Sequence, residues 1–376
     1  RHRSFAETAE ARRDTPGGVA TRTMCRAGAT KTDERVERFG VRATALSAHP
    51  RLHTVSVALL FHLVYLVVPL SLASVPVILL RCVGWKAALA APALWLAPTW
   101  GLERKLGAPW PAFQNLFLWK YLFSWFPITL ERAKDATFSS SKTYVFAAHP
   151  HGALAFHRAA FGFDEAHLWA PTFGRSEGGA VDYRVLTASA AFAVPGIREF
   201  WLWSRCVDAS KPVARGVLRA HTSILVYPGG EREQILTKKG AHVVYLNKRK
   251  GFVKLALETD SPLVPMYAFG ETDLYDHWGL LLSVRRWLVA RFGVAIPLIS
   301  GSCFLLPHRV PIRIVVGAPI DVARFREQYS DSGGTVNGGL ASAVDALHAA
   351  YVDALRALFD EHKARCGYPD AELVVV

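Results

Sequence analysis

The stretch "KTYVFAAHPHG", residues 142–152, joins an apolar run to two histidines, a proline and a glycine. Its first part, 143–147, has the β-branched and aromatic character of a buried strand. In open α/β sheets the chemistry gathers where strands end and loops begin, so His149 and His151 are candidate functional residues. Pro150 stiffens the turn, and Gly152 lets a backbone amide approach a ligand closely.

Further β-rich runs downstream alternate with segments of helical spacing. The predicted strands lie at 183–188, 223–228, 262–269 and 311–317, and the predicted helices at 211–222, 250–260 and 341–363. The stretch 329–342 before the last helix reads as a flexible loop. This alternation predicts an α/β domain over 139–376, with a mostly parallel sheet flanked by helices.

An uncharged apolar run precedes this domain, "TVSVALLFHLVYLVVPLSLASVPVILL" at 54–80. As a helix it would be about 40 Å long, more than the roughly 30 Å hydrocarbon core of a bilayer. A buried core helix is the alternative, but one of this length normally shows a polar stripe. A second apolar run at 87–100 would be only about 20 Å long. Together they predict a membrane-embedded helical hairpin over 52–100 that dips into one leaflet or crosses and returns, kinked at Pro69 and Pro76.

The segments on either side of the hairpin have their own compositions. Residues 1–51 lack hydrophobic periodicity and predict a disordered basic tail, with a targeting signal as the alternative. Residues 101–138 are rich in tryptophan, which is typical of a membrane interface, although core packing against the hairpin would explain them equally. Four basic residues at 35–51 and two at 104–105 flank the hairpin, while its turn has only Arg81 and Lys86, so both ends of the hairpin should face the cytosol.

The totals limit the function classes. The formal net charge of +13 suits nucleic acid, an anionic membrane or phosphorylated ligands, but the charge is scattered and no nucleic-acid-binding module is visible. Five dispersed cysteines predict neither a disulfide framework nor a zinc ribbon. The motifs of P-loop kinases, serine hydrolases and dinucleotide enzymes are missing from the sequence. A membrane-attached globular protein fits best.

Three interpretations of the two histidines compete. Metal ligation would need further ligands at suitable spacing, and two structural histidines would need only local partners. A general base would need a carboxylate to orient its ring, and the turn "VYPGGEREQ" after the 223–228 strand offers Glu231 and Glu233. The adjacent Gly229 and Gly230 expose amides suited to an oxyanion, although a simple strand-to-helix loop with solvated charges would have the same sequence.

A basic segment follows this turn. It could hold phosphates beside the start of the 250–260 helix, or it could be a solvated or membrane-contacting face. Its charged residues are Lys248, Arg249, Lys250 and Lys254. The next predicted strand ends in the "FGE" turn, 269–271, with Tyr275 close behind.

These motifs in this order resemble the type-2 diacylglycerol acyltransferase family, which also includes monoacylglycerol and wax-alcohol acyltransferases. The resemblance runs from about Leu52 to the C-terminus. It rests on "HPHG" (149–152), "PGIRE" (195–199), "YPGGEREQ" (227–234), "RKGFVKLAL" with "PLVPMYAFGE" (249–271), "PIRIVVGAPIDV" and "VDALHAAYVDALRALFDEHK".

The resemblance implies a glycerolipid-acyltransferase-like fold in an endoplasmic-reticulum membrane enzyme that also works at lipid droplets, with its catalytic domain facing the cytosol. The reaction would move a fatty acyl group from acyl-CoA to diacylglycerol, forming triacylglycerol without a cofactor or metal. Monoacylglycerol or a long-chain alcohol is the alternative acceptor, and a non-catalytic lipid-droplet protein is the alternative class. A homo-oligomer is left open, and no nucleic-acid partner is expected.

The resemblance also implies roles for residues. His151 would take the proton of the acceptor hydroxyl in a direct transfer without an acyl-enzyme, with His149 positioning the loop, although either histidine could be the base. Glu233, which completes a GG-x-x-E pattern, would orient His151, because the H-x-x-x-x-D pattern of related acyltransferases is absent. The oxyanion amides would be those of Gly152, Gly229 and Gly230. Acyl-CoA would meet Arg232, Lys248, Arg249, Lys250 and Lys254, and the acceptor would meet Phe269, Gly270, Glu271 and Tyr275.

Overall fold

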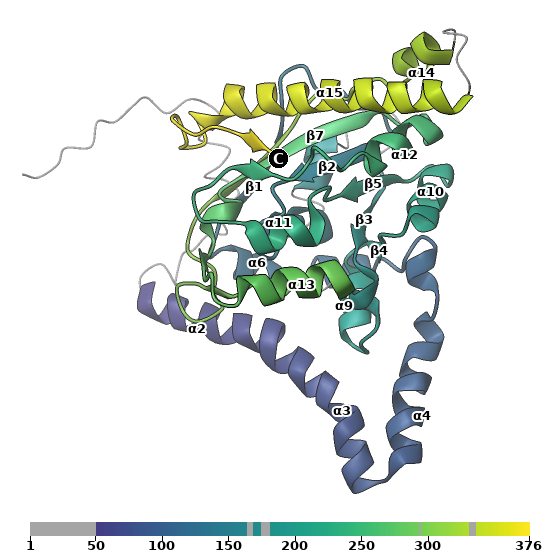
Figure 1. Ribbon diagram of the computed structural model, residues 1–376. Coiled ribbons are helices and arrows are strands. Elements are labelled where there is room, and N and C mark those ends of the chain that lie inside the picture. Colours follow the sequence, from purple (N-terminus) through teal and green to yellow (C-terminus); the bar gives the residue numbers. More distant parts are fainter. Residues whose placement is uncertain (1–49, 164–167, 174–180, 293–294, 331–335) are drawn as a thin grey trace, which may run out of the picture. The chain divides into compact units, whose positions relative to one another are not determined.

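The computed structural model describes residues 50–163, 168–173, 181–292, 295–330 and 336–376, all within one compact unit (Figure 1). The predicted N-terminal tail lies outside the described residues, except that its last two residues, Pro50 and Arg51, begin helix α2 (Pro50–His62).

A seven-stranded sheet forms the centre of this unit, in the order β1-β10-β7-β2-β5-β3-β4. All neighbouring strands run parallel except β10 and β7, which confirms the predicted mostly parallel sheet. The strands are β1 (Ile128–Arg132), β2 (Val145–His149), β3 (Tyr183–Thr187), β4 (Cys206–Asp208), β5 (Ser223–Val226), β7 (Leu263–Phe269) and β10 (Ile312–Val316). The expected domain boundary at 139 is therefore too late, because β1 already pairs with β10.

Side chains alternate along the central strands and feed two hydrophobic cores. On β2, Val145 and Ala147 face one core while Phe146 and Ala148 face the other. The first core is covered by α10 (Lys211–Arg219), α12 (Gly251–Thr259), α14 (Ala323–Ser330) and α15 (Val336–Lys363). The second is covered by α2, α6 (Phe117–Phe123), α7 (Ala159–Gly162), α8 (Trp169–Phe173) and α9 (Ile197–Trp203).

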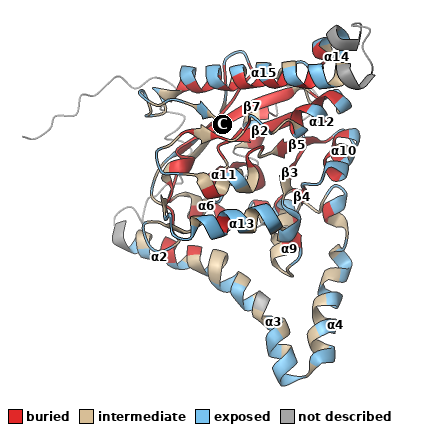
Figure 2. Ribbon diagram, viewed as in Figure 1, coloured by how far each residue is buried: buried red, intermediate tan, exposed pale blue. Residues whose placement is uncertain are grey.

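The closing helix α15 lies across the sheet with Leu347, Tyr351 and Leu355 buried and Asp345 and Asp353 exposed, as its sequence pattern predicts (Figure 2). It begins at Val336, so the last part of the predicted 329–342 loop is helical. The remaining elements are short: α5 (Pro111–Gln114), α11 (Gly230–Leu236), α13 (Leu282–Phe292), the small strands β6 (Val243–Val244), β8 (Asp276–His277), β9 (Ile299–Ser300) and β11 (Val374–Val375), and 3-10 turns.

The N-terminal apolar runs form a helical hairpin, as predicted. Helix α2 continues through a π-helical turn (Leu63–Val67) into α3 (Val68–Cys82), and α4 (Trp85–Leu96) returns after a turn at Gly84, whose φ is +117°. The π turn lies directly before Pro69, which has no N–H to donate to the helical ladder. The stretch Leu52–Cys82 is long and apolar enough to cross a membrane, whereas no second such helix is found among the described residues.

Helix α2 and the α3–α4 part of the hairpin differ in how far their apolar side chains are exposed (Figure 2). In α2, Val57, Ala58 and Phe61 are buried against the domain. The α3–α4 part instead exposes large apolar side chains. Among them are Leu70, Val77, Ile78, Leu80, Val83, Trp85, Leu89, Leu94 and Trp95.

The aromatic segment before the sheet is largely core. Trp119 and Trp125 are buried, and the Trp125 indole donates to the Pro307 carbonyl at 2.8 Å, whereas Trp110 and Phe117 are exposed. Of the two explanations open for these aromatics, the structure therefore favours packing for most of them, because α6 is covered by α2.

The "PGIRE" motif ties the end of the hairpin to the domain. The guanidinium of Arg198, 1% exposed, donates to the Glu103 carboxylate, to the Thr99 carbonyl and, at 3.0 Å, to the Thr99 hydroxyl. The Glu199 carboxylate accepts from the Gly196 amide and from the same hydroxyl at 3.2 Å. These buried charges are paired, and they join α9 to the chain leaving α4.

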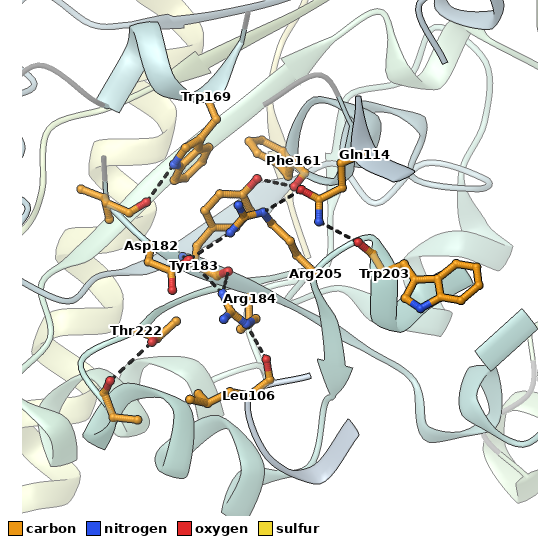
Figure 3. Close-up of polar contacts among 12 residues, drawn as sticks. Leu106, Gln114, Phe161, Trp169, Asp182, Tyr183, Arg184, Trp203, Arg205 and Thr222 are labelled. Atoms are coloured by element: carbon orange, nitrogen blue, oxygen red, sulfur yellow. Dashed lines mark hydrogen bonds and ion pairs between the residues drawn. The ribbon is translucent and has the colours of Figure 1, made fainter. Parts of the chain in front are cut away.

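A second polar cluster holds the start of β3 (Figure 3). Asp182 accepts from Arg184 at 2.8 Å and from Arg205 at 2.9 Å, and the Arg184 Nε donates to the Leu106 carbonyl at 2.6 Å. Nearby, Gln114 donates to the Trp203 carbonyl at 2.6 Å. The segment between hairpin and sheet is thus fixed to the β3–β4 edge at several points.

Replacing Arg198 should therefore loosen the hairpin from the domain. We expect Arg198→Ala to lower the free energy of unfolding by about 3–5 kcal/mol, because it removes the buried partner of the Glu103 carboxylate and leaves only the exposed Arg104, 3.5 Å away. Thermal unfolding of detergent-solubilised protein measures this. Arg365→Ala, which breaks the exposed pair with Glu131, is the control and should cost less than about 1 kcal/mol. Equal losses of unfolding free energy in the two variants would contradict the assignment of Arg198 as the residue that ties the hairpin to the domain.

Candidate active site

The site is created by three neighbouring parallel strands. β2 pairs with β5 on one side and β7 on the other, all three running in the same direction. Because parallel strands end at the same edge, the loops "HPHG", "YPGG" and "FGE" that follow them are brought together. The motifs that the sequence placed after three separate strands thus occupy one place in the fold.

His149 is the last residue of β2 and is fully buried. The Tyr351 hydroxyl donates to the Ala147 carbonyl at 3.2 Å, so the 3.0 Å contact between His149 Nε2 and that hydroxyl has the imidazole as donor. Nδ1 is then the unprotonated nitrogen, and it has no hydrogen-bond partner. Burial, with a smaller contribution from His157, lowers the pKa of His149 to about 3, so the ring is neutral. Its contacts suit a residue that positions the loop.

His151 lies two residues further on, past a cis His149–Pro150 peptide, and is partly exposed. Its Nδ1 contacts the Gly152 carbonyl at 3.0 Å, and since a carbonyl only accepts, Nδ1 carries the proton. The lone pair of the neutral ring is therefore on Nε2. Burial lowers the pKa of His151, which favours the neutral form that a general base requires.

Glu233 does not orient the His151 ring, contrary to the prediction. Its carboxylate, 1% exposed, accepts from the backbone N–H of His151 and from that of Tyr245 at 2.9 Å. Burial raises the pKa of Glu233 to about 7, against the opposing effect of these two bonds. Glu231 is half-exposed, whereas Glu233 is buried and fixes the main chain of the loop rather than the imidazole.

Glu271 is the carboxylate that holds an imidazole, and that imidazole is His157. The carboxylate, 3% exposed, accepts from the Phe156 and His157 amides at 2.8 Å each and from His157 Nδ1 at 3.0 Å. Sequence reasoning missed His157, because it stands in an apolar loop without a motif of its own. The only available signal was a third histidine six residues after His151.

The Tyr227 ring lies between the two loop histidines. Its centroid is 5.5 Å from that of His151 and 5.2 Å from that of His157, both edge to face. The Tyr227 hydroxyl and His157 Nε2 are both buried without a hydrogen-bond partner. Buried polar atoms are normally paired, so these two are exceptional.

The glycines make room for the two glutamates. Gly152 has φ +63°, and a Cβ there would come within 2.6 Å of the Glu271 side chain. A Cβ on Gly229 would overlap the Glu233 carboxylate. Gly230 has φ +53°, and its amide already donates to the Tyr227 carbonyl at 3.2 Å, which makes it a poor oxyanion donor. Of the three predicted oxyanion amides, those of Gly152 and Gly229 remain candidates.

The predicted acyl-CoA residues are only partly gathered. Arg249 donates to the Gly229 carbonyl at 3.4 Å and so reaches the site. Lys250 pairs with Asp345 of α15 at 2.7 Å, and Lys254 lies 3.8 Å from Glu258 one turn further along its own helix α12. Arg232 and Lys248 are exposed.

The predicted acceptor-side residues separate as well. Phe269 is buried on the α15 face of the sheet, where strand alternation turns it, and it stacks on Phe359; its contact with the acceptor stays a prediction. Gly270, with φ +90°, is required by the close approach of the Pro311 carbonyl. Tyr275 is buried in the other core, and its hydroxyl donates to the Leu305 carbonyl at 2.8 Å.

Comparisons with known proteins give the class and the family of this chain. The chain is an acyltransferase. Residues 78–376 match the family model described as diacylglycerol acyltransferase, and the chain belongs to that family.

Three relatives illustrate the family. The chain is 30% identical to diacylglycerol O-acyltransferase 2-like protein 6 of Bos taurus, over 80% of this chain and 89% of that protein. It is 31% identical to acyl-CoA wax alcohol acyltransferase 2 of Mus musculus (75% and 84% covered) and to diacylglycerol O-acyltransferase 2 of Dictyostelium discoideum (67% and 75% covered).

Among solved structures, the 1-acyl-sn-glycerophosphate acyltransferase PlsC of Thermotoga maritima matches with a TM-score of 0.34 at 14% identity. The match covers 64% of this chain and 76% of that one.

The fit of glycine against glutamate gives a direct test. We expect Gly152→Ala and Gly229→Ala to abolish most activity and lower the folded fraction, because each new methyl group meets a buried carboxylate. Gly216→Ala in α10 is the matched control: its methyl meets nothing within 4 Å, so the change should be neutral or stabilising by up to about 1 kcal/mol. Activity per folded protein is the measurement, and wild-type activity of Gly152→Ala would contradict the packing.

Proposed function

We propose that this protein transfers a fatty acyl group from acyl-CoA to the free hydroxyl of diacylglycerol, forming triacylglycerol. The observation that carries the proposal is His151, whose Nδ1 is held by the Gly152 carbonyl so that Nε2 is free to accept a proton where three strand ends meet. Relatives named for diacylglycerol support this acceptor. A relative named for wax alcohols makes a long-chain alcohol the second candidate, and monoacylglycerol a third.

The chemistry needs one base and no covalent intermediate. The acceptor oxygen attacks the thioester carbon as His151 Nε2 takes the hydroxyl proton; the C–S bond then breaks, and the proton passes to the coenzyme A sulfur. The amides of Gly152 and Gly229 would stabilise the oxyanion. His149, held by Tyr351, and Glu233, bonded to the His151 amide, keep the loop in shape.

Acyl-CoA is an anionic substrate, and the basic side chains near the "YPGG" turn suit it. Arg249 is the best placed, since its guanidinium lies against Gly229, and the exposed Arg232 and Lys248 lie nearby in sequence. Lys250 and Lys254 would contribute long-range charge rather than direct contacts, because they are engaged with Asp345 and Glu258.

The acceptor is insoluble in water, so the enzyme should work at a bilayer. The exposed apolar side chains of α3 and α4 support insertion of the hairpin into a membrane. We propose the endoplasmic reticulum, with the catalytic domain on the cytosolic side and a further location on lipid droplets. If the hairpin spans the bilayer, its turn lies on the side opposite the catalytic domain, whereas a hairpin that only dips into one leaflet keeps its turn within the membrane.

We propose that the reaction needs no metal or other cofactor, because a thioester is already activated toward an alcohol. Among the described residues, no group of three or more histidine, cysteine, aspartate or glutamate side chains is arranged to hold a metal ion. Activity in membranes should therefore be unchanged by EDTA. Loss of activity in EDTA that zinc restores would contradict this.

The acceptor is tested directly with membranes from a host that lacks triacylglycerol synthesis. Labelled oleoyl-CoA is offered with diacylglycerol, monoacylglycerol or hexadecanol, and products are separated by chain class. We expect labelled triacylglycerol from diacylglycerol. Wax ester as the main product would make a long-chain alcohol the acceptor, and diacylglycerol would make it monoacylglycerol. No product from well-expressed protein would overturn the enzymatic proposal.

Removing the base should leave little activity. We expect His151→Ala to lower kcat by about 10²- to 10⁴-fold, the contribution of a positioned general base. His221→Ala, at an exposed histidine after α10, is the control and should leave kcat unchanged. Full activity of His151→Ala at equal protein level would reject His151 as the base and leave His149 as the next candidate.

A further inference from the structure

The pair formed by Glu271 and His157 is not used by the mechanism above. Both side chains are almost fully buried, and the carboxylate accepts three hydrogen bonds from the loop that follows "HPHG". A carboxylate accepts only, so His157 Nδ1 carries a proton and Nε2 points away from Glu271. This is the carboxylate–imidazole arrangement that the sequence predicted for His151 with Glu233.

The pair is connected to His151 by a closed ring of contacts. Glu271 bonds His157, the His157 ring contacts Tyr227, and the Tyr227 ring contacts His151. His151 Nδ1 then donates to the Gly152 carbonyl, and Gly152 lies directly against the Glu271 side chain. The His151 ring thus has two neighbours, the Gly152 carbonyl and the Tyr227 ring. The first is linked to Glu271 by direct contact of Gly152, and the second through His157.

The unpaired atoms of the ring distinguish it from an ordinary core. Tyr227 and His157 each keep one buried polar atom without a partner. Leaving such groups unpaired costs free energy, so each one calls for an explanation, and a role in catalysis is one such explanation. A purely structural loop cap would need the Glu271 carboxylate and the two amides, but neither the imidazole nor the phenol.

We propose that Glu271 and His157 are positioning residues of acyl transfer, which hold the His151 ring through Tyr227 and Gly152 and set its basicity. This inference rests on the proposed function, since it assigns to His151 the role of base. On this inference Glu271, and not Glu233, is the carboxylate that positions the His151 imidazole.

The charges around His151 give the two residues opposite effects. The negative charge of Glu271 raises the pKa of His151, whereas a protonated His157 lowers it. Other ionisable groups face His151 from the neighbouring turn, and they stay in place in the tests below. These groups are Glu231, Glu233 and Tyr227.

The experiment compares the pH dependence of kcat/KM, whose acid limb reports the base of the free enzyme. Glu271→Gln removes a negative charge and should move the acid limb to lower pH, and His157→Gln should move it to higher pH. Both should lower kcat by about tenfold or more while KM for acyl-CoA and acceptor stays within about twofold, as expected for a misplaced base.

A matched control is the half-exposed pair of His308 and Asp276, whose Nε2 and Oδ2 are 2.8 Å apart outside the site. Asp276→Asn should leave kcat and the acid limb unchanged. Tyr227→Phe, which keeps the ring, should retain more activity than Tyr227→Leu. Equal loss of activity in these two variants would overturn the Tyr227 ring as the connection between His157 and His151.

The outcomes separate the two proposals. An inactive wild type with every acceptor would overturn the proposed function, and this inference with it. An active wild type in which Glu271→Gln and His157→Gln leave the acid limb in place would overturn only the inference, even if both variants lose protein level as a structural loop cap would. Acid limbs that shift in the same direction in Glu271→Gln and His157→Gln would also contradict the inference.

Discussion

Two buried carboxylates govern the architecture of the site. An ionised side chain can remain in an apolar interior only where hydrogen-bond donors surround it, and the nearest donors are backbone amides. Glu233 takes the amides of His151 and Tyr245, and Glu271 takes those of Phe156 and His157. The loops must curl around these oxygens, and Gly152 and Gly229 are the residues that allow the approach.

The same constraint connects the sheet to the chemistry. Each glutamate follows one outer strand of the β5-β2-β7 group and bonds the loop that follows the central strand. The histidine loop is thereby held from both sides, and its ring orientations are decided by its neighbours rather than by its own sequence. On the proposed mechanism, the two carboxylates support catalysis by fixing this loop, without needing to touch a substrate.

The hairpin solves a different problem for the same enzyme. Its first helix packs into the core beside α6, while α3 and α4 keep their apolar surface exposed. Arg198 and Glu103 bind the returning chain back to α9. Because the charges at this joint are paired and buried, the exposed apolar helices are attached to the globular domain without disturbing the sheet.

The sequence by itself determined the features that depend on local pattern. The strand and helix alternation, the long apolar run and the place of His149 and His151 at a strand end all follow from periodicity and turn residues. Tertiary structure alone decided which carboxylate meets which histidine. Glu271 and His157 are 114 residues apart, and only the order of strands in the sheet brings them together. The place of Phe269 against α15 was decided in the same way, since the surroundings of a strand residue depend on what covers its face of the sheet.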